Sequence, residues 1–236
     1  MNRDILHLLL IGGIFFALFL AGEFLFHIVK VKGEYTRKFI HISTGFITLL
    51  FPFFFTSHWY VLILCAGFAV ILKLSLKLNM LKSINAIDRD SHGSISYPAS
   101  VYGTFLFAQY AYSQGFEPAL YFVPILTLAL CDPAAAITGK NLPWKPFKVG
   151  EGKKTVSGTL AFFMSALALN FILVRVLTIS HPGPCILMAA TIAVFTTIAE
   201  AVSRKGLDNI FVPATAILLL WFFLRYTHLF ISTSVA

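Results

Sequence analysis

Charged side chains are scarce in this chain: Asp, Glu, Lys and Arg make up 12% of its 236 residues, whereas 58% are hydrophobic. A mean hydropathy of +0.84 excludes a water-soluble domain of this length. Cysteine is rare too. Cys65, Cys131 and Cys185 fall in apolar runs without CxxC or metal-ligand spacing, so we interpret them as packing residues without a redox role. The histidines contain no pair at zinc-ligand spacing.

Long apolar runs fill most of the chain. About 20 such residues cross the ~30 Å hydrocarbon core of a bilayer as a helix. The sequence therefore predicts an all-α fold, a polytopic transmembrane helical bundle that forms a single integral membrane domain over residues 1–236. About eight spans are expected, near residues 5–29, 39–55, 59–78, 98–113, 119–137, 156–177, 185–202 and 210–230. The second and fourth are short, so either could be broken or re-entrant.

The basic residues alternate between the connections. Fifteen of the 18 Lys and Arg residues follow odd-numbered spans: Lys30, Lys32, Arg37, Lys38, Lys73, Lys77, Lys82, Arg89, Lys140, Lys145, Lys148, Lys153, Lys154, Arg204 and Lys205. The positive-inside rule puts these connections in the cytoplasm and both termini on the non-cytoplasmic side. The net charge of +8 is thus explained by topology and does not call for a nucleic-acid partner.

Three carboxylates interrupt the apolar runs, and each lies late in an odd-numbered span: Glu23, Asp132 and Glu200. Ionisable groups at such depth are costly and are functional candidates. Under the predicted topology all three belong to one cytoplasmic layer. Each could instead snorkel to the interface or cap a neighbouring helix. Asp132 is the strongest functional candidate, because it opens the motif DPAAAITGK, in which small residues permit close helix packing before Gly139 and Lys140. Its carboxylate could hold Mg²⁺ bound to phosphates.

A glycine- and lysine-rich connection, KVGEGKKTVSGT, covers residues 148–159. Glycines such as Gly158 let backbone N–H groups approach phosphate oxygens, and Lys153 and Lys154 supply positive charge. Thr155 or Ser157 can cap the following helix, whose N-terminus favours anions. The alternative is a flexible basic loop that contacts anionic lipid headgroups. A nucleotide-binding P-loop fold is not expected, because its spacing fails and no strand is predicted before it.

Two further cytoplasmic segments carry polar groups. Arg37, His41 and Gly45 recur at intervals of four, so a helix would present them on one face. Arg37 and Lys38 are also expected there as topology determinants, and His41 as a packed polar residue. In the last connection, Asp208 and Asn209 are either a helix cap or further ligands for metal and phosphate.

The ordered motifs RKFIH, DPAAAITGK, GKKTVSGTLAFF and GLDN resemble the membrane family of dolichol kinase, phytol kinase and CTP-dependent diacylglycerol kinase. That family is related more distantly to phosphatidate cytidylyltransferases. The resemblance implies a multi-pass membrane enzyme of lipid metabolism and phospholipid biosynthesis, a CTP-dependent lipid-alcohol phosphotransferase. By position, the family's Arg-Lys pair matches Arg37 and Lys38, its aspartate and glycine match Asp132 and Gly139, and its loop matches Lys153, Lys154, Ser157 and Gly158.

These observations lead to one mechanistic hypothesis. Arg37, Lys38, Lys153 and Lys154 hold the phosphates of CTP, or another nucleoside triphosphate, and Mg²⁺ bridges them to Asp132 and Asp208. Lys154 and Asp132 act in catalysis, and Glu200 deprotonates the hydroxyl of diacylglycerol, a polyprenol, dolichol or phytol at the cytoplasmic face. His41, Gly139, Lys140, Thr155, Ser157, Gly158 and Asn209 complete the predicted nucleotide site. The rivals are a phosphatidate cytidylyltransferase-like enzyme and an ion-coupled or lipid transporter.

Overall fold

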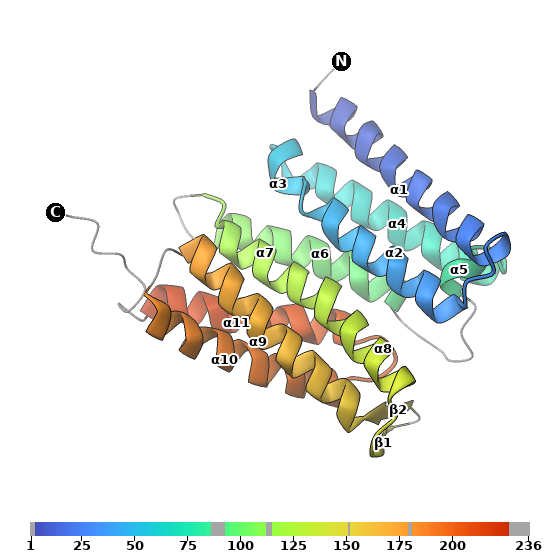
Figure 1. Cartoon of the computed structure of the whole chain (residues 1–236). Coiled ribbons are helices and arrows are strands. Elements are labelled where there is room, and N and C mark those ends of the chain that lie inside the picture. The colour runs from blue at the N-terminus through green and yellow to red at the C-terminus, as the bar shows by residue number, and fades with distance from the viewer. Residues whose placement is uncertain (1–2, 86–92, 112–114, 151, 179–180, 227–236) are drawn as a thin grey trace. The chain divides into compact units, whose positions relative to one another are not determined.

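The computed structural model describes residues 3–85, 93–111, 115–150, 152–178 and 181–226. Helices dominate these residues, which confirms the predicted all-α class (Figure 1). The chain divides into two compact units, Met1–Gly103 and Thr104–Ala236, which are described separately below. The prediction of a single membrane domain stays a prediction. Arg89 and the start of the polar segment around it lie outside the described residues.

The first unit is built around a long N-terminal helix. It contains α1 (Arg3–His27), α2 (Gly33–Thr48), α3 (Phe51–Phe54), α4 (His58–Lys77), α5 (Lys82–Asn85) and the start of α6 (Gly93–Tyr110). Helix α1 packs against α2, α4 and α5. Its close approach to α2 depends on Gly22, because a Cβ there would lie 2.5 Å from Cδ1 of Ile40. The predicted second span is split between α2 and α3, and Pro52 stands in the first turn of α3.

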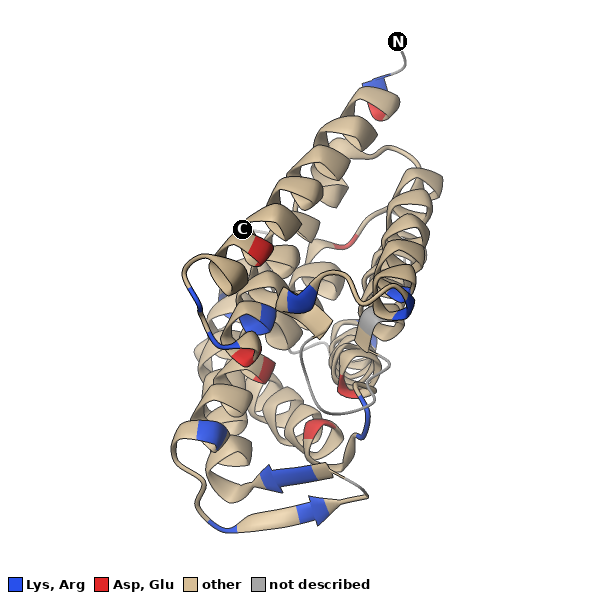
Figure 2. Cartoon of the chain, turned by 90° about the vertical axis from the view of Figure 1, so that its right-hand side faces the viewer, with Lys and Arg blue, Asp and Glu red and all other residues tan. Residues whose placement is uncertain are grey.

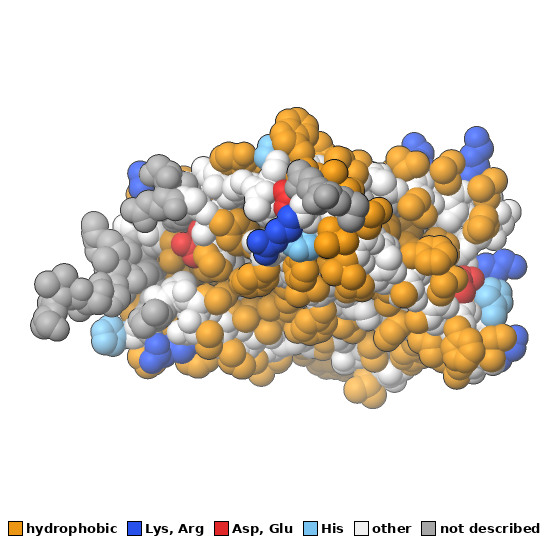
Figure 3. All heavy atoms as spheres, turned by 90° about the horizontal axis from the view of Figure 1, so that it is seen from above, with side chains coloured by type: hydrophobic (Ala, Val, Ile, Leu, Met, Phe, Trp, Pro, Cys, Tyr) orange, Lys and Arg blue, Asp and Glu red, His pale blue; other side chains and the backbone are white. Residues whose placement is uncertain are grey.

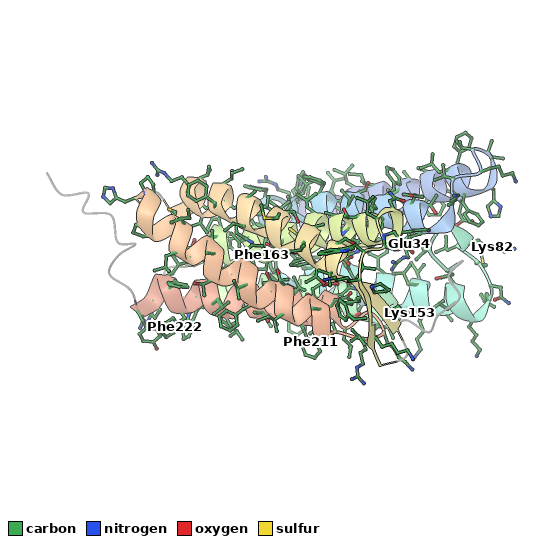
Figure 4. The ribbon with its side chains drawn as sticks, turned by 60° about the horizontal axis from the view of Figure 1, so that its bottom comes forward. Glu34, Lys82, Lys153, Phe163, Phe211 and Phe222 are labelled. Carbon is green, nitrogen blue, oxygen red and sulfur yellow. The ribbon has the colours of Figure 1, made fainter. Side chains whose placement is uncertain are left out.

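The second unit is a bundle of packed helices. It contains the end of α6, then α7 (Pro118–Leu126), the π-helix η1 (Thr127–Cys131), α8 (Asp132–Asn141), α9 (Val156–Thr178), α10 (Pro182–Val202) and α11 (Asp208–Tyr226). Helix α9 packs against α7, α8 and α10, and α11 packs against α7 and α10. Fully buried side chains such as Leu120, Phe162 and Met188 form the core. Phe211 and Phe222 stay exposed on α11 (Figure 4), as expected of a helix that faces lipid.

Six helical segments are long and apolar enough to cross a membrane: Arg3–His27, His58–Lys77, Pro118–Asn141, Val156–Thr178, Pro182–Val202 and Asp208–Tyr226. Hydrophobic side chains accordingly cover much of the surface (Figure 3). Helix α2, with 16 residues, and α6 correspond to the two spans predicted to be short. The count of eight spans and the side of the termini remain predictions. The three cysteines are free and buried, as the packing interpretation expects.

A two-stranded hairpin connects α8 to α9. Strands β1 (Pro146–Val149) and β2 (Gly152–Thr155) pair antiparallel, and Gly150 follows β1 with a φ of 61°. The expectation that no strand precedes the lysine-rich motif is therefore wrong. Strands of four residues carry too little hydrophobic alternation to be recognised in sequence, and their pairing depends on the glycine that a left-handed turn position favours. The hairpin presents lysines on both strands (Figure 2).

Candidate functional site

Asp132 follows a local change of helical geometry. Pro133 has no N–H, and its ring would clash with the carbonyl of Ala129 four residues earlier in a regular α-helix. The wider π-helical turn η1 over Thr127–Cys131 accommodates that proline and passes directly into α8 at Asp132. Such π-turns are frequent at functional sites. Asp132 is buried at this junction.

A buried polar contact fixes η1 against α9. The hydroxyl of Thr127 donates to Oδ1 of Asn170 at 2.9 Å, and Nδ2 of Asn170 donates to the carbonyl of Ala166 at 2.8 Å. Both side chains are fully buried. A buried hydrogen bond of this kind sets the position of one helix along another, because any slip would leave its polar atoms unpaired. The contact therefore helps to position Asp132 in the second unit.

Lys154 and Glu200 form an ion pair in the second unit. Nζ of Lys154 lies 2.6 Å from Oε1 of Glu200 and also donates to the backbone carbonyl of Glu200. That carbonyl lies near the end of α10, where the helix dipole favours a cation. The Glu200 residue is only 6% exposed. The ion pair ties the hairpin to α10.

Two other carboxylates act on Glu200. The charges of Asp132, at the start of α8, and Asp208, at the start of α11, both interact electrostatically with it. Oε2 of Glu200 is buried and has no hydrogen-bond partner among the described residues. The structure thus brings together four predicted site residues from four elements: Asp132, Lys154, Glu200 and Asp208. We call these four residues the charged cluster.

Four of the other predicted residues make contacts that hold α8, α9 and the hairpin together. The Thr155 hydroxyl accepts from the N–H of Gly158 at 3.1 Å, so Thr155 caps α9 as predicted. Ser157 donates to the carbonyl of Leu142. A Cβ on Gly139 would lie 2.6 Å from Oγ1 of Thr155, and one on Gly158 would lie 2.8 Å from the carbonyl oxygen of Ala135. Both glycines thus permit the close packing of α8 on α9, whatever binds nearby.

The remaining predicted residues of the second unit lie at the surface or at a helix start. Lys140 is exposed in the last turn of α8, and Lys153 is exposed on β2. The backbone N–H of Asn209 donates to Oδ1 of Asp208 at 3.1 Å, a local contact between neighbouring residues at the start of α11. The hairpin turn is close to Arg204, since a Cβ on Gly150 would lie 2.9 Å from Cδ of that side chain.

The predicted residues of the first unit are placed by local contacts. Arg37 pairs with Glu34 one helical turn away, with NH2 and Oε1 2.7 Å apart. Lys38 is buried. The ring of His41 packs edge-on against Tyr97, with centroids 4.7 Å apart. These contacts agree with α2 being a polar-faced helix, and the nucleotide-binding role of Arg37, Lys38 and His41 stays a prediction.

Glu23 has a structural partner. Its Oε1 accepts from the backbone N–H of Ser83 at 2.8 Å, in the first turn of α5, and its Oε2 lies 3.2 Å from Nε2 of His27. The helix-capping interpretation of Glu23 is therefore confirmed. Asp132 differs from Glu23 in opening the motif DPAAAITGK, whereas basic residues and a glycine follow Glu23 and Glu200 alike.

Sequence reasoning missed three contributors to this arrangement. Asn170 stands alone in an apolar helix, which is a usable signal for a buried polar contact. Gly150 and Arg204 gave no signal, because their contact joins two connections that are far apart in the chain. Among the described residues, groups of three or more His, Cys, Asp and Glu able to hold a metal ion are absent.

Comparison with known proteins adds one informative relative. The chain is 27% identical over 205 residues to phytol kinase from Synechocystis sp., an alignment that covers 87% of this chain and 86% of that protein. No family model matches the chain, and no solved structure matches it. Similarity along nearly the whole of both proteins supports the phytol and dolichol kinase-like family that the motifs predict.

Proposed function

We propose that this chain, which is similar to phytol kinase over most of its length, is a membrane lipid kinase. It transfers the γ-phosphate of CTP, or of another nucleoside triphosphate, to the hydroxyl group of a lipid alcohol at the cytoplasmic face. Phytol is the first acceptor to test, because the relative is named for it. Diacylglycerol and polyprenols or dolichol are the other candidates.

The observation that carries the proposal is the position of Lys154. An ammonium group has three N–H donors, and Glu200 accepts from two of them, through Oε1 and its backbone carbonyl. Within the described part of the chain these are the two acceptors of Lys154, which leaves the third donor for a phosphate oxygen. Phosphoryl transfer depends on positioned positive charge that stabilises the charge developing on the transferred group. Lys154 supplies one such charge in a fixed direction.

Asp132 and Asp208 are the proposed ligands of Mg²⁺. A protein site for this ion commonly needs one or two carboxylates, since phosphate oxygens and waters complete its octahedron. The charged cluster fits that demand, because its three acidic groups outnumber its one lysine. When bound with the nucleotide, Mg²⁺ supplies further neutralisation of phosphate charge.

Glu200 is better suited to position Lys154 than to act as the general base. Its Oε1 is committed to the Lys154 ammonium group at 2.6 Å, so this oxygen is not available to accept a proton from a lipid hydroxyl. We therefore propose Glu200 as a positioning residue that acts through Lys154. Arg37, Lys38 and His41 remain proposed phosphate-binding residues of the first unit, and Lys140 and Asn209 remain proposed for the second.

The proposal is tested with the purified protein in vesicles that contain phytol, diacylglycerol or a polyprenol, each supplied with CTP or ATP and Mg²⁺. Formation of a lipid monophosphate from at least one pair is expected. Asp132→Asn, which keeps the size of the side chain, should abolish most of that product. A wild-type protein that phosphorylates none of these lipids, or an Asp132→Asn variant as active as the wild type, contradicts the proposed site.

A further inference from the structure

The two faces of the β1–β2 hairpin differ in character. Successive residues of a strand point to opposite faces, so the register Phe147↔Lys154 and Val149↔Gly152 defines one face, and Lys148↔Lys153 belongs to the other. Phe147, Val149 and Lys154 are half-buried, and Lys154 pairs with Glu200 on this inner face. Lys148 and Lys153 are both exposed, and we call their side the outer face.

Lys148 and Lys153 stand directly opposite each other across the two strands. Side chains at such positions have Cβ atoms about 5 Å apart, and two like charges there destabilise the pairing. An arrangement that places two ammonium groups side by side in water is favourable when an anion lies between or beside them. The outer face is therefore suited to a negatively charged partner that both lysines can contact at once.

The segment before β1 adds an aromatic group of the kind found at membrane surfaces. Trp144 is 54% exposed, and Nζ of Lys145 lies 4.9 Å from the centre of its ring. Leu142, two residues earlier, is exposed as well. Tryptophan concentrates at the level of the lipid headgroups, where its ring is buried and its N–H stays hydrated. An exposed tryptophan among lysines fits that environment.

The position of the hairpin in the chain brings headgroups within reach. It connects Pro118–Asn141 to Val156–Thr178, and both segments are long and apolar enough to cross the bilayer. Lys148 and Lys153 are thus only a few residues from two membrane-spanning helices. Anionic lipids attract basic residues that are held near the membrane surface.

We propose that the outer face of the hairpin, Lys148 and Lys153 together with Trp144 and Lys145, docks on the anionic headgroups of the surrounding bilayer. The two adjacent lysines of the GKKT motif then have separate partners. Lys154 faces the charged cluster and belongs to the proposed nucleotide site, whereas Lys153 faces away from it and holds the hairpin on the membrane. This division replaces the expectation that both lysines bind the same nucleotide.

The fluorescence of Trp144 tests this docking without any need for enzymatic turnover. Trp59→Phe and Trp221→Phe leave Trp144 as the single tryptophan of the full-length chain. The protein is reconstituted in vesicles of phosphatidylcholine alone or of equal parts of phosphatidylcholine and phosphatidylglycerol, each with brominated acyl chains that quench nearby tryptophans. We expect stronger quenching and bluer emission in the anionic vesicles, and a loss of that difference at high salt.

Substitutions of the outer-face lysines complete the test. Lys148→Gln with Lys153→Gln should remove most of the difference between the two kinds of vesicle. Equal quenching in both vesicles, or a difference that survives the outer-face substitutions, overturns the proposal. A rise of several fold in the nucleotide KM of the outer-face variant would also overturn it, because those lysines would then bind nucleotide. Absence of any kinase activity would contradict the proposed function and leave the fluorescence result intact.

Discussion

Lys154 and Glu200, 46 residues apart in the chain, form an ion pair in which Nζ and Oε1 are separated by 2.6 Å. The pair joins the hairpin to α10 and has two other carboxylates, Asp132 and Asp208, in its electrostatic surroundings. The candidate site of the second unit is organised around this contact, and two predictions concern it directly.

The first prediction concerns stability. Lys154→Met leaves the Glu200 carboxylate buried without its partner, and removal of one member of a buried pair costs up to about 3–5 kcal/mol of unfolding free energy. Adding Glu200→Leu removes the unpaired charge, so the double variant should recover much of the lost unfolding free energy. Unfolding of the four proteins of this cycle in detergent measures the coupling. Strictly additive effects of the two substitutions would mean that the ion pair contributes nothing.

The second prediction separates positioning from proton transfer. Glu200→Gln keeps an oxygen for the Lys154 ammonium but weakens its hold, so the nucleotide KM should rise about tenfold while kcat changes less and the shape of the pH–rate profile is kept. Loss of a general base would instead lower kcat by about 10²–10⁴ and remove one limb of that profile. Glu200→Asp is the matched control, because it keeps the charge while shortening the side chain. Steady-state kinetics over a range of pH distinguishes the two roles.

The helices of the second unit could be predicted from the sequence more closely than the contacts between them. Expected spans 156–177 and 185–202 correspond to Val156–Thr178 and Pro182–Val202, because long apolar runs leave few alternatives to a helix. Thr155 caps α9, as predicted. The close helix packing that we predicted from the small residues after Asp132 is seen where α8 contacts α9. Local chemistry determines each of these features.

Other features depend on residues that are distant in sequence. The hairpin, the π-turn before Asp132 and the Lys154–Glu200 pair were not anticipated, since each depends on packing between separate elements. From the sequence we assigned Lys153 and Lys154 the same role as positive charges. In a β-strand, however, two adjacent side chains point to opposite faces. Glu23 and Glu200 both interrupt apolar runs, and only the packing shows that Glu23 caps α5 whereas Glu200 pairs with Lys154.

The third prediction concerns Gly158, where α8 and α9 approach closely. Gly158→Ala would put a Cβ 2.8 Å from the carbonyl oxygen of Ala135 and 3.1 Å from Oγ1 of Thr155, so the helices must separate. We expect a loss of about 1–3 kcal/mol of unfolding free energy. Gly67→Ala in the interior of α4 is the control, because a Cβ there meets nothing within 4 Å. That variant should be as stable as the wild type or up to about 1 kcal/mol more stable. Thermal unfolding compares the two, and equal effects would rule out the close contact.

The fourth prediction concerns Glu23, which we interpret as a helix cap. Glu23→Ala removes the acceptor of the Ser83 N–H and should lower the unfolding free energy by about 1 kcal/mol. Glu23→Gln retains an acceptor oxygen, so it should be close to the wild type in stability and in lipid phosphorylation. A stable Glu23→Gln protein without kinase activity would show that this carboxylate has a catalytic duty.

The central claim is that the chain transfers a terminal phosphate to a lipid alcohol. In the rival reaction, the same charged groups stabilise attack of the lipid on the α-phosphate, and pyrophosphate is released. CTP labelled at either the α- or the γ-phosphate separates the two reactions when the reconstituted protein is given phytol, diacylglycerol or phosphatidate. The account predicts that γ-label enters the lipid fraction with a lipid alcohol and that α-label does not. Transfer of α-label to phosphatidate, with γ-label recovered in pyrophosphate, would contradict it.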